Sequence, residues 1–337
     1  MTSRKQAQGR QNLDKKKATR AADLSWSQCR TPYFTLFVLL QFLTARAINV
    51  PESEGAYTQE FFEEHRKNQG VYPLLVQAMW DTIRSFSPND RGSGRGDFSV
   101  LDVGCGHGLL VEAWRRAGTT ESHCMEGSEE AAPMWPAANR TRYYQVVDLA
   151  GEEAPLRVPP TDVVTSFEVA EHLPESRATA FVGLMVQHKP AWVFFGAATV
   201  FQDLGKNPSH VNERPLTYWV EKFREHQYVL HPWETLRLRL ALLQVGEGAT
   251  EVLQAWWYPK NALVFVPVSR QAEADRAVLQ HAQGIIVEQL PQGDIGGDSL
   301  FGLMWKRDWT EFANIFHQAR AQAERNQFLE GQGGGEF

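Results

Sequence analysis

The pattern of hydrophobic and polar positions predicts a helical segment followed by an alternating α/β region. Over residues 57–86 apolar side chains recur at helical spacing, as at Leu75, Met79 and Ile83, which predicts two helices that meet near Gly70. From residue 98, short β-rich runs alternate with helical segments. The predicted strands are 98–103, 122–126, 142–147, 162–167, 191–197, 228–230 and 262–268, and the predicted helices lie near 108–117, 128–138, 174–188, 215–226 and 231–246. Strands that alternate with helices in this way predict a doubly wound, parallel α/β sheet.

The N-terminal segment, residues 1–49, has the pattern of a targeting leader. A basic, polar stretch precedes the apolar run YFTLFVLLQFL at 33–43, and small residues follow at Ala45 and Ala47. This is typical of a signal peptide or signal anchor, and the apolar run is short for a membrane span, which takes about 20 residues. We expect a secretory (endoplasmic reticulum or Golgi) or organellar location, with membrane contact only through the leader. A leader that does not function would leave the protein in the cytoplasm.

The remaining boundaries follow the changes in pattern. We expect a helical preface at 50–97, the α/β domain at 98–270 and a C-terminal helical extension at 271–337. Within the extension, residues 309–327 predict a closing helix, and the final EGQGGGEF is typical of a disordered tail.

Composition and charge narrow the classes of function. The 337 residues are 43% hydrophobic and include 11 Trp and 19 Phe, enough for a large packed core. The net charge is −6, but residues 1–31 hold eight Lys and Arg against two Asp, which leaves about −12 on the rest of the chain. An acidic body disfavours a nucleic-acid partner. The cysteines Cys29, Cys105 and Cys124 predict no disulfide framework, and the last two are expected as small core residues on strands.

The stretch VLDVGCGHGLLVEAW at 100–114 predicts a ligand-binding loop between a strand and a helix. Gly104, Gly106 and Gly108 allow the backbone to turn sharply and to approach a ligand at the carboxyl edge of the sheet. Asp102, at the end of the strand, suits a cationic or hydroxyl-rich ligand. The loop lacks the Lys and Ser/Thr of a P-loop and the G-x-G-x-x-G spacing of dinucleotide sites, which disfavours a nicotinamide oxidoreductase.

Two acidic residues follow later strands in the order found in a known family. Glu126 ends the second strand and Asp148 follows the third. With the loop sequence DVGCGHG, this order resembles the class I S-adenosylmethionine-dependent methyltransferases over roughly residues 70–268. The resemblance implies a Rossmann-like methyltransferase fold with a mainly parallel, seven-stranded sheet whose last strand is antiparallel.

The resemblance also implies roles for single residues in binding S-adenosyl-L-methionine. The three glycines, with Cys105 between them, would pass the methionine moiety, and Asp102 would lie near its ammonium group. Glu126 would hold the ribose hydroxyls. Asp148, with Leu149 beside it, would hold the adenine amino group.

The stretch SFEVAEHLPES at 166–176 places Glu168, Glu171 and His172 at i, i+3 and i+4, on one face of an expected helical turn. Two interpretations stay open. In the first, Glu168 packs under the cofactor and His172 supports the structure. In the second, the three residues and His210 bind Mg²⁺ or another divalent cation. The second resembles the ubiquinone-type O-methyltransferases and the small-RNA 3′-end methyltransferases, which carry E-x-x-E-H here and a further His after strand five.

These four residues are the candidate catalytic groups. A bound cation lowers the pKa of the hydroxyl that it ligates, and without a cation His172 or His210 is a candidate general base. We expect His210 and Asn212 at the rim of the acceptor pocket, whereas the aromatic residues Tyr218, Trp219 and Phe223 are expected to pack a helix onto the sheet.

The sequence therefore predicts methyl transfer from S-adenosylmethionine, with O-methylation of a small molecule or glycan favoured. One alternative is an RNA 3′-end methyltransferase, which needs a basic groove that the charge pattern scarcely provides. Another is a catalytically inactive methyltransferase-fold binding module. Such a module would be expected to lose Asp102, the glycines or Glu126, and all of them are present.

Overall fold

The computed structural model describes residues 58–86, 98–135, 143–149, 158–202, 204–246, 256–282, 285, 287 and 300–333. All of them lie in one compact unit, Ser53–Phe337. The leader predicted at 1–49 lies outside the described residues. Among the helices in the described part of the chain, none combines the length and the hydropathy that a membrane span requires.

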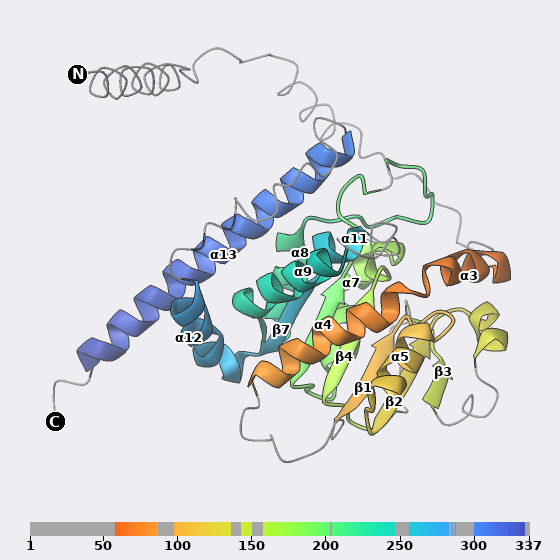
Figure 1. Cartoon of the computed structure of the whole chain (residues 1–337), viewed down its shortest axis with the longest axis horizontal. Helices are drawn as coiled ribbons and strands as arrows, with labels where there is room; N and C mark the ends of the chain where they lie inside the picture. Colours follow the sequence, from red (N-terminus) through yellow and green to blue (C-terminus); the bar gives the residue numbers. More distant parts are fainter. Residues whose placement is uncertain are drawn as a thin grey trace, which may run out of the picture. The chain divides into compact units, whose positions relative to one another are not determined.

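A seven-stranded sheet forms the centre of the fold (Figure 1). Its strands are β1 (Ser99–Val103), β2 (Glu121–Glu126), β3 (Tyr144–Val146), β4 (Val163–Phe167), β5 (Trp192–Gly196), β6 (Tyr228–Leu230) and β7 (Leu263–Pro267). The order across the sheet is β3-β2-β1-β4-β5-β7-β6. Strand β7 runs antiparallel to β5 and β6, and the other pairs are parallel. The predicted sheet is confirmed, and its parallel strands bring their carboxyl ends to one edge.

Helices connect the strands and extend the chain beyond the sheet. The α-helices are α3 (Gln59–His65), α4 (Val71–Phe86), α5 (Leu109–Ala117), α7 (Ala178–Val186), α8 (Leu216–Glu225), α9 (Pro232–Gly246), α11 (Trp257–Asn261), α12 (Gln271–His281) and α13 (Leu300–Gly333). The short 3₁₀ helices are η1 (Arg66–Asn68), η3 (Glu129–Met134), η4 (Ala170–His172), η5 (Glu175–Arg177) and η6 (Val268–Arg270).

The two faces of the sheet carry separate cores because alternate residues of a strand point to opposite sides. On β1, Val100 packs in a cluster with Leu75 of α4 and Trp114 of α5. Its neighbour Leu101 belongs to the opposite cluster, which also holds Phe181 of α7 and residues of α8, α12 and α13. Helices α4 and α5 contact each other and lie over β1 and β4 in Figure 1. The helical preface therefore forms part of the core of the α/β domain.

Three helical segments differ from the prediction. The helix expected at 128–138 is the 3₁₀ helix η3, which contains Pro133. Helix α12 lies within the predicted helical extension at 271–337, but its bounds were not predicted, since its buried face consists of small residues, Ala274 and Ala277 with Val278, whose hydrophobic signal is weak. Helix α13 begins at Leu300, nine residues before the predicted start at 309, and continues to Gly333, so residues 330–333 of the predicted tail are helical.

Helix α13 is packed onto the domain by its buried aromatic face. It contacts α8, α9, α11 and α12 (Figure 1), and Phe312 and Phe316 are fully buried. The buried Arg239 of α9 donates from Nε to the carbonyl oxygen of Ala262 at 2.8 Å. Its guanidinium carbon lies 4.2 Å from the ring centroid of Phe312, an arrangement that adds cation–π attraction to apolar burial. The extension is therefore continuous with the core.

Candidate active site

Strand β1 brings a buried carboxyl group to the carboxyl edge of the sheet. Asp102 is 4% exposed, and its Oδ1 accepts a hydrogen bond from Thr165 Oγ1 of β4 at 2.7 Å. Burial raises the pKa of Asp102 to about 7, although the Thr165 hydrogen bond opposes the rise. This carboxyl group is thus poised to ionise when a cation binds beside it.

The glycine loop joins β1 to α5 through three left-handed residues. Gly104, Gly106 and Gly108 have φ values of 78°, 51° and 76°, a region that side-chain-bearing residues rarely adopt. At Gly104 an added Cβ would overlap the side chain of Val169 in the turn after β4. The predicted cofactor loop and the predicted acceptor turn are therefore in direct contact.

Replacing Gly104 by alanine is expected to lower the free energy of unfolding by more than the cost of a left-handed alanine alone, which is about 1 kcal/mol. The excess arises because Val169 must move, and the measurement is urea denaturation. Gly205→Ala is the matched control, since Gly205 has φ 72° and no atom near the added Cβ. Equal losses in the two variants would contradict the close packing of loop and turn.

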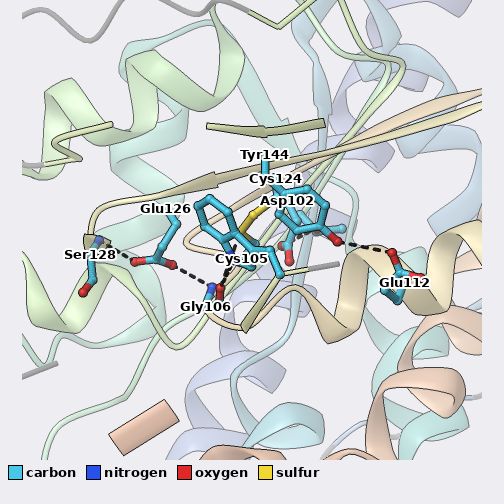
Figure 2. Close-up of a disulfide and its surroundings, with 10 residues drawn as sticks. Asp102, Cys105, Gly106, Glu112, Cys124, Glu126, Ser128 and Tyr144 are labelled. Carbon is cyan, nitrogen blue, oxygen red and sulfur yellow. Dashed lines mark hydrogen bonds between the residues drawn. A yellow bond between two sulfur atoms is a disulfide. The ribbon is translucent and has the colours of Figure 1, made fainter. Parts of the chain in front are cut away.

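Glu126 ties the glycine loop to the end of β2, as Figure 2 shows. Its Oε2 accepts a hydrogen bond from the Gly106 amide at 2.6 Å, and its Oε1 accepts one from the Ser128 amide at 2.9 Å. The Trp135 indole donates to the Gly106 carbonyl oxygen at 2.7 Å. Burial raises the pKa of Glu126, while the backbone hydrogen bonds lower it. The carboxylate thus stands beside the loop, where the resemblance places the ribose.

The structure corrects the interpretation of the two cysteines near this loop. Cys105 and Cys124 form a disulfide with a Cα–Cα distance of 5.6 Å (Figure 2), which is typical of such bonds. Cys124 lies on β2 as expected, but Cys105 lies in the glycine loop after β1. No local pattern indicates the pair, because 19 positions separate the two cysteines and only the parallel pairing of β1 with β2 brings them together.

The second predicted acid lies at the neighbouring strand end. Asp148 follows β3 and is exposed, whereas Leu149 is 7% exposed and belongs to the main core. The amide of Val147 donates to the carbonyl oxygen of Glu126 at 2.8 Å, so the ends of β2 and β3 stay in register. Glu126 and Asp148 therefore stand at the carboxyl ends of two adjacent strands, on one edge of the sheet.

The turn after β4 departs from the expected helical turn. Glu168 has a left-handed φ of 57° and precedes the short helix η4, which contains Glu171 and His172. The Glu168 carboxylate accepts hydrogen bonds from Gln202 Nε2 at 2.5 Å and from Asn261 Nδ2 at 2.9 Å. Burial raises the pKa of Glu168, and these two amide donors lower it. Glu168 is thus anchored to the segments that follow β5 and precede β7.

Glu171, His172 and His210 form a compact cluster. One potential ligand atom from each residue lies within 4.8 Å of the others. The Glu171 side chain is fully buried, and among the described residues neither of its carboxylate oxygens accepts a hydrogen bond of good geometry. Burial and the neighbouring charge of Glu168 raise the pKa of Glu171 well above its ordinary value, although the backbone amides of Glu171 and Ala198 lower that pKa. A buried carboxylate that is so weakly compensated by hydrogen bonds calls for a cation or a proton.

Residues of the loop after β5 contact the Nδ1 atoms of both histidines in this cluster. His172 Nδ1 lies 3.2 Å from the Ser209 carbonyl oxygen, and His210 Nδ1 lies 3.0 Å from Glu213 Oε1. The two imidazole rings meet edge to face with centroids 4.8 Å apart. Sequence reasoning did not single out Ser209 or Glu213, although Glu213 stands three positions after His210 in the same loop.

Other residues singled out in the sequence support the fold and do not line the site. Asn212 is 1% exposed. Its backbone amide donates to the Glu171 carbonyl oxygen at 2.8 Å, and its side-chain amide donates to the Ala170 carbonyl oxygen at 3.5 Å. Asn212 therefore supports η4 and does not lie at the pocket rim, contrary to the expectation from the sequence. Trp219 and Phe223 are buried in the core and Tyr218 is partly buried against it, which confirms their predicted packing role.

A buried ionic network, whose lysine Lys260 acts on the charge of Glu168, was also not predicted from the sequence. Lys260 of α11 donates to Asp308 Oδ2 of α13 at 2.8 Å, and Thr199 Oγ1 donates to the same oxygen at 2.6 Å. Burial would raise the pKa of Asp308, but Lys260 and Arg307 outweigh it and hold that pKa below its ordinary value. The available signal for this network was the pair of polar residues directly before the apolar strand β7, Lys260 and Asn261.

Comparison with known proteins defines the class. A family model described as a methyltransferase domain matches residues 62–267, more than half of the chain. The chain therefore belongs to this family, and it is a class I S-adenosylmethionine-dependent methyltransferase. The family assignment confirms the resemblance found in the sequence.

Similarity to individual proteins is more distant. The ubiquinone biosynthesis O-methyltransferases of Salmonella newport (strain SL254) and Salmonella typhi are each 28% identical over 138 residues, 37% of this chain and 57% of the relative. The match thus spans little more than half the length of these relatives. Among solved structures, a putative methyltransferase from Bacillus halodurans C-125 is 17% identical with a TM-score of 0.37, covering 46% of this chain and 69% of that one. An S-adenosylmethionine-dependent methyltransferase from Clostridium acetobutylicum ATCC 824 is 14% identical with a TM-score of 0.31, covering 40% and 53%.

Proposed function

We propose that the protein methylates an oxygen atom of a small molecule or glycan and that Glu171, His172 and His210 form the acceptor end of its site. The observation that carries this proposal is the cluster itself, in which buried Glu171 meets two half-buried histidines beside the turn that packs against the cofactor loop through Val169 and Gly104. An alcohol or phenol is a weak nucleophile at neutral pH, so a group that removes or withdraws its proton is the main chemical requirement. The names of the Salmonella relatives agree with oxygen as the acceptor atom.

At the cofactor end, two buried carboxyl groups suit the polar parts of S-adenosylmethionine, which supplies a methyl group on a sulfonium. Asp102 would face the ammonium group and Glu126 the ribose hydroxyls, and the left-handed glycines let the backbone approach closely. Asp148 and Leu149 would hold the adenine, and Cys105 would flank the methionine moiety. The raised pKa values of Asp102 and Glu126 support these roles, because a cation and two hydroxyl donors would compensate their burial.

At the acceptor end, the cluster fits a divalent cation. Among the described residues the Glu171 carboxylate accepts no hydrogen bond of good geometry, and a carboxylate with two imidazoles is a donor set for Mn²⁺ or Zn²⁺ as well as Mg²⁺. Glu168 stands beside these ligands. A cation held there would lower the pKa of the acceptor hydroxyl. The same histidines would otherwise accept the hydroxyl proton as a general base.

The affinity for S-adenosylhomocysteine, the demethylated product, is expected to rise with pH. Asp102 is half protonated near pH 7 in the free protein, and the ligand's ammonium group favours its ionised form, so binding releases a proton at lower pH. We expect about tenfold tighter binding at pH 8 than at pH 6, measured by calorimetry. Asp102→Asn should bind more weakly and lose this dependence. Parallel pH profiles in the two proteins would exclude Asp102 from the ammonium site.

The function is tested in two stages. Calorimetry with S-adenosylhomocysteine first establishes the cofactor. Transfer of a labelled methyl group is then measured on phenols, catechols, sugars and RNA 3′ ends, each with Mg²⁺, with Mn²⁺ and with a chelator. Labelled phenols, catechols or sugars would support the proposal, and loss of transfer with chelator would support the metal. Labelled RNA ends alone would replace the acceptor class, and transfer that is insensitive to chelator would leave His172 or His210 as the base.

A further inference from the structure

The Glu213 carboxylate, in the loop after β5, contacts both a histidine of the cluster, His210, and the backbone of its own loop. Glu213 Oε1 lies 3.0 Å from His210 Nδ1, and its other oxygen, Oε2, accepts a hydrogen bond from the Phe201 amide at 2.6 Å. The His210 and Glu213 side chains are only 10% and 15% exposed, so this contact is poorly screened by solvent. Phe201 itself has a left-handed φ of 63°, a conformation that persists only where surrounding contacts hold it.

The partner of Nδ1 decides which nitrogen carries the proton. An ionised carboxylate only accepts hydrogen bonds, so Glu213 requires a proton on His210 Nδ1 and places the lone pair on Nε2. The Ser209 carbonyl oxygen, also an acceptor only, lies 3.2 Å from His172 Nδ1. The Ser209 hydroxyl lies 3.1 Å from the same nitrogen but donates its only proton to Asn207 Oδ1, so it too requires a proton on His172 Nδ1. Both histidines of the cluster are therefore in one tautomer, with Nε2 as the basic nitrogen.

We propose that Glu213 is a positioning residue, which fixes the tautomer and the ring orientation of His210 so that Nε2 serves the acceptor end of the site. This inference rests on the proposed role of His210, whether that histidine binds a cation or accepts a proton. Histidines that bind metals commonly donate their other ring N–H to a carboxylate or carbonyl, and loss of such a partner weakens metal binding about 10- to 100-fold.

The tautomer is measured directly by nitrogen-15 NMR of the histidine rings in the full chain, at a pH about two units above the ordinary histidine value. His210→Gln assigns the signal. We expect Nδ1–H for His210 in the wild type and a shift toward Nε2–H in both Glu213→Ala and Glu213→Leu, the second of which keeps the side-chain volume. Glu213→Gln should retain Nδ1–H, because its amide oxygen still accepts. Glu221→Ala, at an exposed position on α8, is the control.

A second measurement is the affinity for Mn²⁺, determined by electron paramagnetic resonance of the free ion. Glu213→Ala and Glu213→Leu should bind Mn²⁺ about 10- to 100-fold more weakly, and Glu213→Gln should lie between them and the wild type. Nε2–H in the wild type, or Nδ1–H retained in both apolar variants, would overturn the proposal. If the wild type binds no Mn²⁺, the metal part of the proposed function fails, and the NMR result still decides the role of Glu213.

Discussion

Asp308→Ala is expected to lower the free energy of unfolding by about 3–5 kcal/mol, because it leaves the Lys260 ammonium buried without its counter-charge. Lys260 is 0% and Asp308 1% exposed along their side chains, so water cannot take over the lost contact. The same substitution removes the acceptor for Thr199 Oγ1. Urea denaturation of the full chain measures the change.

Two further variants show whether the loss of stability comes from the unpaired buried charge or from any change on α13. The double variant Lys260→Met, Asp308→Leu removes both charges and should recover much of the loss, since an apolar pair can replace a buried ion pair. Glu311→Ala, also on α13, removes an acceptor for the exposed Thr217 and should cost about 1 kcal/mol or less. A loss below about 1 kcal/mol in Asp308→Ala would show that the buried pair does not hold α13 in place.

Glu171→Gln is expected to reduce methyl transfer by about 10²- to 10⁴-fold while the affinity for S-adenosylhomocysteine changes little. The substitution keeps the shape of the side chain but removes the charge that would hold a cation or stabilise a protonated histidine of the cluster. Initial rates and calorimetry on the same preparation provide the comparison, with Glu221→Gln as the matched surface control. Weakened cofactor binding, with full activity restored at saturating cofactor, would contradict the assignment.

The same variant should not lose stability. Because burial raises the pKa of Glu171 in the folded protein, its contribution to stability is present at low pH and is lost as the pH rises through the folded-state pKa. Glu171→Gln removes that loss, so we expect it to unfold at an equal or higher temperature than the wild type at pH 8. Reduced activity with equal or greater stability is the signature of a group retained for function.

The sheet and the cofactor loop could be predicted because their signals are local. Seven apolar runs mark the strands, and the spacing of Gly104, Gly106 and Gly108 marks a turn that only a left-handed backbone can make. The order of Glu126 and Asp148 then followed from the order of the strands. Each of these signals lies within a short stretch of sequence.

The acceptor end was predicted only in part because its geometry depends on distant segments. Glu168 leaves the expected helical face because its backbone amide bonds the Gly196 carbonyl oxygen and its carboxylate reaches Gln202 and Asn261. Asp308 is 48 positions from Lys260, and no periodic pattern links a position on one helix to a position on another. Glu213 could have been found as an acidic residue close to His210, but nothing in the sequence shows which way its side chain points.

The packing of α13 onto helices α8, α9, α11 and α12 has a consequence for where the shared family segment and the buried core of this chain end. The segment shared with the methyltransferase family ends at residue 267, yet the counter-charge of Lys260 and the aromatic rings over Arg239 come from the later helix α13. A fragment cut at the family boundary would contain all seven strands but would expose a lysine, an arginine and an apolar face that the whole chain buries. The segment shared with the family therefore ends before the segment that completes the burial of these groups, which continues through α13.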